Sequence, residues 1–335
     1  MPKDYIIIGA EESPYSVKVR SYFRYKDIPH QWLTRAEAGE LYRQHAKLPL
    51  VPLVVTPDDQ GLQDSTPIIE TVEAAHPEPS IHPIEPVSAF VSCLLEEFGD
   101  EWGNKWMFHY RWAREIDQRA CSKRLAAITM PNASEQQLNE AAETIRERMV
   151  DRVWFVGSSP QTAQQIEESF KDTLSWLELH LAERAYLFGA RPAFADFALW
   201  GQIYNAHRDP TPRRIVESQA PHTLKWVQRM LDPKGEGEFE SWDALAPTLT
   251  PLLTDQVAEL FLPWSAANAN AIEQQSESFT VELRHRSWTQ KPQKYHARSL
   301  AALQSKYAEL TDTAAVDAVL EATGCLQWLR SEGSE

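Results

Sequence analysis

The sequence predicts an α/β domain, then an all-helical domain, then a mostly helical C-terminal extension. Strand-like apolar runs alternate with helical segments through about the first 80 residues. From residue 87 to about residue 229 the apolar residues instead recur with helical periodicity. Near Pro233 the composition becomes loop-like, and helical segments follow it. We therefore divide the chain into residues 1–80, 87–251 and 252–335.

The first part of the chain predicts the order β-α-β-α-β-β-α. Tyr5–Ala10 is a continuous apolar run typical of a buried strand. Ser13 and Pro14 form a helix start, with serine as the N-cap and proline at the first helical position. The remaining elements are a strand at 30–35, a helix at 39–47, a strand at 48–56 and a short strand that enters a helix near Ser65.

Local sequence patterns also predict the structure of the linker and of the C-terminal extension. The proline-rich stretch His76–Pro86 predicts a linker. The extension predicts three helices and a β-hairpin around Ser278–Gln290. Between Phe279 and Tyr307 the extension is basic in an otherwise acidic chain. We expect this basic stretch to dock on the protein's own acidic surface; covering the active site or binding an anionic substrate are the alternatives.

Composition excludes several classes of function. The chain has 335 residues, 43% hydrophobic residues and a net charge of −15, which argues against a nucleic-acid partner. Cys93, Cys121 and Cys325 show no CxxC pairing, so neither a disulfide framework nor a zinc site is expected. No apolar run approaches the length of a membrane span or a signal peptide. We expect a soluble cytoplasmic protein that binds no metal, nucleic acid or membrane.

Two features in the first domain point to a specific chemistry. Ser13-Pro14-Tyr15-Ser16 has the form of a Cys-Pro-Tyr-Cys redox motif with oxygen in place of both sulfurs. Pro52 interrupts an apolar strand, where it removes a ladder hydrogen bond and is out of place in a central strand.

With these two features, Asp64-Ser65 and the helical second half, the chain resembles the glutathione transferase superfamily, in particular its serine-type, tau- and omega-like bacterial branch. The segment Arg191–Ile203 resembles the family's structural box at the start of a buried helix, with Ala193 in place of the usual serine or threonine. Asp196 can still accept a hydrogen bond from the Ala193 N–H. The resemblance covers roughly residues 4–230 and implies a thioredoxin-like first domain in which Pro52 is cis.

The resemblance assigns the catalytic role to Ser13. A hydroxyl at a helix N-terminus can donate a hydrogen bond to the glutathione thiolate, and the helix end adds partial positive charge. The alternative for Ser13 is a simple N-cap.

Glutathione, the implied co-substrate, is then held by several other residues. Asp64 suits the ammonium of the γ-glutamyl group, and Ser65 suits its carboxylate. Val51, just before Pro52, is implied to present its backbone to the cysteinyl part. Arg35 is the better candidate for the glycyl carboxylate and Lys47 the other. An Asp-Ser helix cap is the alternative for Asp64 and Ser65.

The substrate side is predicted from an aromatic stretch. Trp102, Trp106 and Tyr110 recur at intervals of four residues and share one helix face. The resemblance implies that Tyr15, Trp106, His109 and Tyr110 line the electrophile pocket, with His109 or Arg111 polarising the substrate. The alternative is that this face is core or dimer surface.

The leading functional hypothesis is a transferase that activates the glutathione thiolate for attack on a small apolar electrophile. Conjugation, dehalogenation and a lyase reaction stay open. A non-catalytic binding or scaffold protein of the same fold is the second hypothesis. A thiol–disulfide reductase is disfavoured because Ser13 cannot form a mixed disulfide. The resemblance also implies a homodimer, although the extension could block or replace the family's dimer surface.

Overall fold

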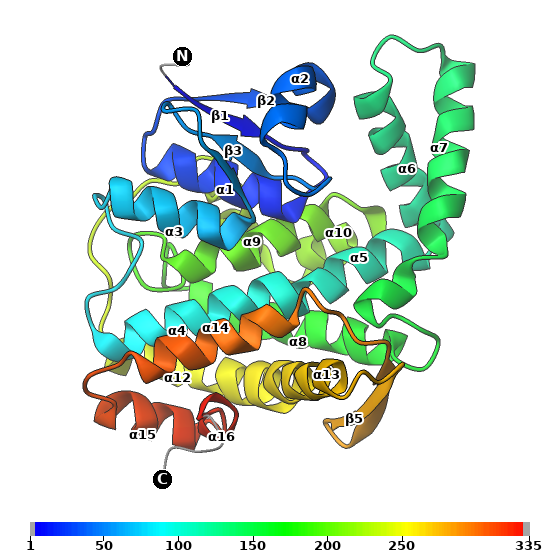
Figure 1. The fold of residues 1–335 in the computed structure, drawn as a ribbon. Coiled ribbons are helices and arrows are strands. Elements are labelled where there is room, and N and C mark those ends of the chain that lie inside the picture. Colours follow the sequence, from blue (N-terminus) through cyan, green and yellow to red (C-terminus); the bar gives the residue numbers. More distant parts are fainter. Residues whose placement is uncertain (1–3, 331–335) are drawn as a thin grey trace.

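The computed structural model describes residues 4–330 (Figure 1). Its first seven elements follow the predicted order: β1 (Tyr5–Ile8), α1 (Pro14–Tyr25), β2 (His30–Leu33), α2 (Arg35–His45), β3 (Leu53–Val55), β4 (Gly61–Gln63) and α3 (Ser65–Ala75). The sheet has the strand order β2-β1-β3-β4, with β2 parallel and β3 antiparallel to β1. The predicted thioredoxin-like fold of this domain is confirmed.

The alternation of β1 divides the core of the first domain between the two faces of its sheet. Ile7 packs in the large core that includes residues of α1 and α3, whereas Ile6 and Ile8 pack with Ala38 and Tyr42 of α2. Each fully buried aliphatic side chain stabilises the fold by about 1.5–3 kcal/mol. The helices on both faces thereby fix the sheet, and the sheet fixes the starts of α1 and α3.

The second part of the chain is helical, as predicted. Its elements are α4 (Pro86–Glu97), the π-helical turn η1 (Phe98–Gly103), α5 (Asn104–Ala113), α6 (Glu115–Thr129), α7 (Glu135–Val150), η2 (Val153–Val156), α8 (Ala163–Leu181), α9 (Phe194–His207), α10 (Pro210–Gln219) and α11 (Pro221–Arg229). The α6–α7 hairpin projects beyond the rest of this part (Figure 1). None of the helices in residues 4–330 is both long and apolar enough to span a membrane.

Helix α9 is buried in the middle of the molecule and supports the first domain. A Cβ added at Gly201 would lie 2.6 Å from the Pro14 carbonyl oxygen, so glycine is needed for α9 to approach the first turn of α1. At its own start, the Asp196 carboxylate accepts hydrogen bonds from the Ala193 N–H at 2.9 Å and the Trp226 indole N–H at 2.8 Å. The predicted capping role of Asp196 is confirmed. Burial raises the pKa of Asp196 to about 7.

The extension packs on the helical domain and contains the predicted hairpin. Its elements are α12 (Trp242–Leu252), the π-helical η3 (Leu253–Phe261), α13 (Leu262–Glu273), β5 (Phe279–Leu283), β6 (Arg286–Gln290), α14 (Ala297–Ala308), α15 (Ala314–Ala322) and the single turn α16 (Leu326–Leu329). Because α12, η3 and α13 form one continuous run, the domain boundary predicted at residue 252 falls inside a helix. Helix α14 lies along α4 in Figure 1.

The basic stretch of the extension docks on the protein's own acidic residues, as expected. Arg284 pairs with Asp172 at 2.7 Å and also with Asp255, and Arg286 pairs with Glu168 of α8. Partly exposed pairs of this kind contribute about 0–1 kcal/mol each. The extension is therefore held mainly by its buried apolar side chains, such as Trp264 and Trp288.

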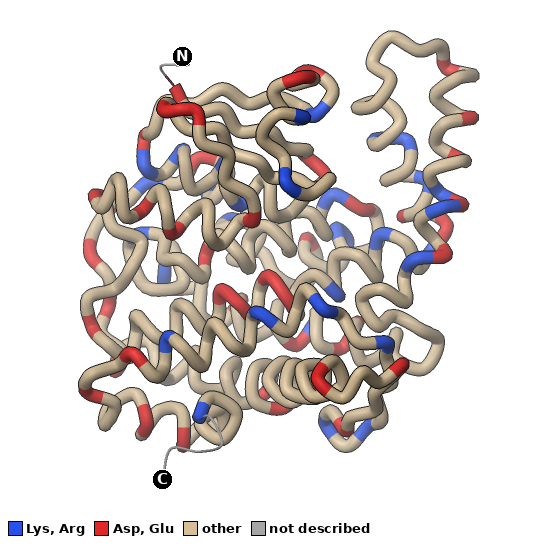
Figure 2. Tube along the Cα trace, viewed as in Figure 1, with Lys and Arg blue, Asp and Glu red and all other residues tan. Residues whose placement is uncertain are grey.

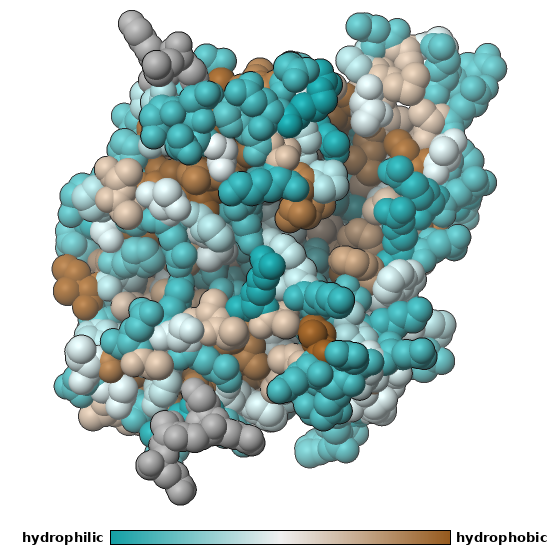
Figure 3. Space-filling model, viewed as in Figure 1, coloured by the Kyte–Doolittle hydropathy of each residue, from teal (hydrophilic) through white to brown (hydrophobic). Residues whose placement is uncertain are grey.

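The surface is hollowed beside the start of α1. Figure 3 shows this hollow between the first domain, the α6–α7 hairpin and the extension, with apolar residues on its walls. The N-terminal end of α1 lies on the side of the hollow.

Candidate active site

The Ser13 hydroxyl caps helix α1 as a hydrogen-bond acceptor, and its proton is available to a ligand. It has extended backbone angles, and its Oγ accepts a hydrogen bond from the Ser16 N–H at 3.2 Å. Among the hydrogen bonds of residues 4–330, the Ser13 hydroxyl donates none. The N-cap role is therefore present in the structure, and it uses only an acceptor position of the hydroxyl. A ligand atom at the helix start can still receive the Ser13 proton.

Val51 and Pro52 lie directly before β3. Their peptide bond is cis, as the resemblance implies. In the described part of the chain, no hydrogen bond engages the backbone N–H or C=O of Val51. Both groups are therefore available to a ligand.

Asp64 and Ser65 lie at the start of α3, but Ser65 already has a partner. Asp64 has a φ of 79° and makes no side-chain cap. The Ser65 hydroxyl donates to Asp100 of η1 at 3.3 Å, and the Thr66 hydroxyl donates to Glu96 of α4 at 2.6 Å. The hydroxyl predicted to bind a ligand carboxylate thus contacts a carboxylate of the protein itself.

A buried lysine joins these groups across the two domains. Lys18 of α1 is 0% exposed, and its Nζ lies 2.6 Å from Asp100 and also pairs with Glu96. Burial alone would lower the pKa of Lys18, but the charges of Asp100 and Glu96 raise it. Burial raises the pKa of Asp100 to about 6, in spite of Lys18. The cluster lies directly beneath Ser65 and fixes α3 against the helical domain.

The same acidic run also contains Glu97, which forms no ion pair in the part of the chain that the structure describes. Figure 2 shows acidic positions gathered along the run from α4 to α5. Burial and the neighbouring Glu96 charge raise the pKa of Glu97 to about 8. Because the unfolded chain gives up this proton at lower pH than the folded protein, the stability contribution of Glu97 falls as the pH rises from about 4.5 to 8.

Replacing Glu97 by glutamine is expected to remove this pH dependence. The free energy of unfolding of the variant should exceed that of wild type by about 1–3 kcal/mol near pH 8 and by little near pH 5. The reason is that a neutral amide replaces a carboxyl group that burial holds neutral. Urea unfolding at both pH values measures the difference. The exposed Glu183 of the same domain, changed to glutamine, is the control. An equal effect at the two pH values would contradict the assignment.

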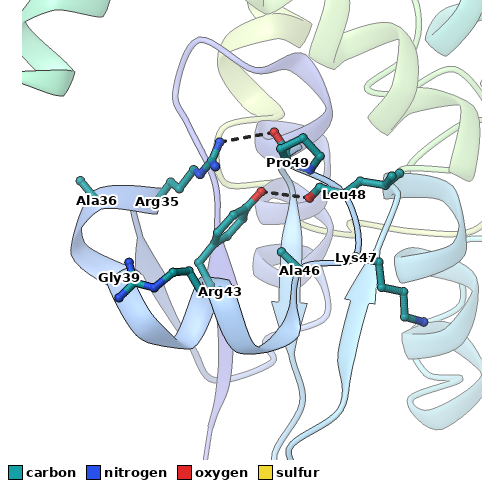
Figure 4. Close-up of a pocket in the computed structure, with 9 residues that line it drawn as sticks. Arg35, Ala36, Gly39, Arg43, Ala46, Lys47, Leu48 and Pro49 are labelled. Carbon is teal, nitrogen blue, oxygen red and sulfur yellow. Dashed lines mark hydrogen bonds between the residues drawn. The ribbon is translucent and has the colours of Figure 1, made fainter.

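The predicted cations for the glycyl carboxylate lie together on a surface cavity. Arg35 and Lys47 line a cavity of about 490 Å³ between α2 and the loop that follows it (Figure 4). The Arg35 guanidinium lies 4.5 Å from the centre of the Tyr42 ring and donates to the Pro49 carbonyl at 3.4 Å. Within residues 4–330, neither cation forms an ion pair. The choice between them stays open.

The predicted electrophile-side residues are mostly core. Trp106, His109 and Tyr110 are at most 1% exposed. The Trp106 indole donates to Ser169, and the His109 ring bonds to Ser158 at 2.8 Å. This helix face therefore packs in the core, which was the alternative to a pocket wall.

Tyr15 and Arg111 were also predicted beside the electrophile, and the structure places them in different surroundings. Tyr15 is only partly buried, and its hydroxyl donates to the Asp100 carbonyl at 3.0 Å. Arg111 is buried and bonds to the Glu12 carbonyl at 2.9 Å and to Asp209 at 3.2 Å. The suggestion that Arg111 polarises a substrate is wrong, because its guanidinium holds the loop before Ser13 to α9 and α10.

Sequence reasoning missed the groups that connect the domains. Lys18 stands in the apolar stretch Val17–Val19, which gave one weak signal, because a lysine on a core face needs a buried partner. Asp100 and Glu96 carried no local signal.

The chain thus combines a thioredoxin-like domain, which has a serine at the start of its first helix, with a helical domain. The family model of the glutathione S-transferase N-terminal domain matches residues 7–80, and that of the C-terminal domain matches residues 160–229. The chain belongs to the glutathione transferase superfamily. No curated protein matches the sequence.

Three solved structures illustrate the likeness. The tau-class glutathione S-transferase of mango is 17% identical, with a TM-score of 0.42, covering 75% of this chain and 100% of that chain. A glutathione S-transferase of Methylobacterium radiotolerans, in complex with glutathione sulfonate, is 18% identical, with a TM-score of 0.37 and coverage of 71% and 98%. The β-etherase LigF of Sphingobium is 17% identical, with a TM-score of 0.47 and coverage of 68% and 94%. The family assignment rests on the two domain models and not on these distant likenesses.

Proposed function

We propose that this protein is a glutathione-dependent transferase that activates the glutathione thiolate for attack on a small apolar electrophile. The observation that carries the proposal is the state of Ser13. Its hydroxyl caps α1 as an acceptor and has a free proton at the positive end of the helix. Both features favour an anion at that point, and a thiolate is the anion that this reaction requires.

The energetics of thiol activation are adequate. A free thiol has a pKa near 8.5, and lowering it by two units takes about 2.7 kcal/mol. A hydrogen bond to a charged group contributes about 1.5–3 kcal/mol, and a helix N-terminus about 0.3–1 kcal/mol. The thiol proton passes to solvent, and the thiolate sulfur forms a bond to the electrophilic carbon. In a substitution the leaving group departs with its bonding electron pair. In an addition the π electron pair moves to the neighbouring carbon, which then takes a proton from solvent.

The remaining contacts position the tripeptide. Asp64 binds the γ-glutamyl ammonium, and the start of α3 binds the carboxylate beside it. Ser65 contributes to that carboxylate only if its hydroxyl turns away from Asp100. The Val51 backbone holds the cysteinyl part, next to Pro52.

The glycyl end of glutathione and the electrophile contact the other predicted residues. Arg35 or Lys47 binds the glycyl carboxylate from the cavity of Figure 4. Tyr15 borders the electrophile. The chemical class of the electrophile decides whether the reaction is conjugation, dehalogenation or lyase-type. The homodimer and the cytoplasmic location stay predictions, as does the division into residues 1–80, 87–251 and 252–335.

A non-catalytic binding module is the second candidate, and one observation favours it. The Ser65 hydroxyl, proposed for the γ-glutamyl carboxylate, already donates to Asp100 of the protein itself. A site whose polar groups are satisfied internally can serve a protein that no longer binds glutathione. The affinity for glutathione separates the two candidates.

Wild-type protein is expected to be retained on immobilised glutathione and to conjugate a chlorodinitrobenzene. Asp64→Asn should lose retention, because the amide cannot pair with the ammonium, with a roughly tenfold weaker affinity or more. Asp243→Asn, an exposed aspartate in the first turn of α12, is the control. Wild-type protein that passes through the column without delay and shows no conjugation would favour the binding-module candidate.

A further inference from the structure

The turn between β1 and α1 carries two acidic residues directly before Ser13. Glu11 and Glu12 follow Ala10, whose carbonyl accepts a hydrogen bond from the Ser13 N–H at 3.0 Å. The Glu12 side chain is only 2% exposed. Because consecutive Cα atoms are about 3.8 Å apart, the Glu12 carboxylate lies within roughly 10 Å of the Ser13 hydroxyl. Like charges repel, so an uncompensated carboxylate at this place would oppose a thiolate at Ser13.

Three arginines from three elements hold the Glu12 carboxylate. Arg124 of α6 donates at 2.9 and 3.2 Å, one hydrogen bond to each carboxylate oxygen. Arg208, at the end of α9, donates at 2.7 and 3.0 Å, and Arg111 of α5 donates at 3.5 Å. Burial alone would raise the pKa of Glu12, but the three guanidinium groups lower it. Glu12 is therefore ionised near neutral pH, and these arginines compensate its charge. We call Glu12 and the three arginines the Glu12 clamp.

The neighbouring Glu11 is paired mainly outside the clamp. Its carboxylate contacts Arg20 of α1 at 2.8 Å and accepts a hydrogen bond from the Tyr204 hydroxyl at 2.8 Å. Arg208 is further away from it, at 3.8 Å. Burial raises the pKa of the Tyr204 phenol, and it raises the pKa of the Cys121 thiol near the clamp to about 12. Both groups are therefore neutral near pH 7, and the charge balance at Glu12 depends on its arginines.

Arg124 serves a second carboxylate besides Glu12. It also pairs with the buried Asp209 at the start of α10, and Asp209 has another cation in Arg111, at 3.2 Å. The clamp and Asp209 thus carry three positive and two negative charges, and loss of Arg124 removes the positive excess. The Arg124 side chain is 25% exposed, so its replacement opens no cavity in the core.

We propose that Arg124 is a positioning residue of the thiolate site, which acts through Glu12: it neutralises that carboxylate, so that the start of α1 keeps the positive potential that a thiolate at Ser13 requires. The inference rests on the proposed function. Arg124 belongs to the α6–α7 hairpin, so the proposal makes this hairpin part of the device that activates the thiol.

The test uses the thiol of Ser13→Cys as a probe of the charge at the helix start, with no glutathione present. A cysteine at a helix N-terminus has a pKa below about 8.5. One charge at roughly 12 Å, with an effective dielectric constant of about 20–80, shifts a pKa by roughly 0.3–1 unit. Adding Arg124→Gln to Ser13→Cys should therefore raise the pKa of that thiol by this amount. The measurement is the pH dependence of iodoacetamide alkylation at position 13, followed by peptide mass spectrometry.

Two further variants separate the charge from the side chain. Arg124→Lys keeps the positive charge and should restore most of the lowered pKa. Arg119→Gln is the matched control, because it removes an exposed arginine of the same helix that pairs with Glu115 at 2.7 Å. It should leave the pKa of the Ser13→Cys thiol unchanged. An equal pKa with and without Arg124→Gln would overturn the proposal, and so would a rise that Arg124→Lys does not reverse.

Turnover provides the second measurement. With Ser13 in place, Arg124→Gln should lower kcat/KM for glutathione conjugation near neutral pH by roughly two- to tenfold and move the pH–rate profile to higher pH. A loss of equal size at every pH would overturn the proposal, because a merely structural defect would produce it. A raised pKa of the Ser13→Cys thiol in a protein that conjugates no glutathione would support the role of the clamp and place the failure on the proposed function.

Discussion

Replacement of Ser13 by alanine is expected to reduce turnover near neutral pH by roughly ten- to hundredfold, because one hydrogen bond to a charged group contributes about 1.5–3 kcal/mol. The pKa of bound glutathione should rise, so the pH–rate profile should move to higher pH. Glutathione affinity should change little, since Asp64 and the Val51 backbone hold the rest of the tripeptide. The measurement is the pH dependence of kcat/KM beside wild type.

Ser16→Ala is the matched control. Its hydroxyl lies three residues further along α1, is buried and has no hydrogen-bond partner in the described residues. Removing it should leave the profile unchanged. An unshifted profile for Ser13→Ala would reduce Ser13 to a helix cap, whose loss costs about 1 kcal/mol of stability. Ser13→Cys should instead form a mixed disulfide with oxidised glutathione, releasing one glutathione thiolate, which mass spectrometry detects.

Replacement of Lys18 by methionine is expected to cost about 3–5 kcal/mol of unfolding free energy, because it leaves Asp100 and Glu96 buried without their cation. The carboxylates then repel each other across the space that the ammonium held. The deficit should shrink between pH ~8 and ~5, since protonation of the carboxyl groups relieves the repulsion. Urea unfolding at both pH values measures the loss.

Lys123→Met, on the exposed surface of α6, is the control for Lys18→Met and should change stability by less than about 0.5 kcal/mol. Equal losses for the two variants would mean that the ion cluster does not fasten α1 to α4 and η1. Because the same cluster lies beneath Ser65, Lys18→Met should also weaken glutathione binding in the fraction that folds.

Much of the fold follows from local patterns in the sequence. Tyr5–Ile8 is a strand because consecutive β-branched residues suit a sheet that is buried on both faces. The helix start at Ser13-Pro14 and the hairpin of Phe279–Gln290 depend on neighbours a few residues apart. The spacing of these features also carried the family resemblance, and with it the expectation that Val51–Pro52 is cis.

In the candidate site, too, the sequence predicts some features and not others. Its backbone features, at Ser13, Val51 and Asp64, follow from where helices and strands begin. Its side-chain partners do not. The aromatic face with Trp106 and Tyr110 shows why, since periodicity gives the shared face but not whether that face meets a cavity or the core. Only packing against α8 assigns it to the core.

The sequence alone determined the order of elements, the helix that presents Ser13 and the family. Tertiary structure decided which charges and hydroxyls meet. Lys18 and Asp100 are 82 residues apart in the chain, and Ser65 and Asp100 are 35 apart. Lys306 of the extension pairs with Glu70 of α3, which is 236 residues away in the chain. Contacts at such separations leave no periodicity or cap in the sequence, because they depend on how α1, α3, η1 and the extension pack together and not on the conformational preferences of neighbouring residues.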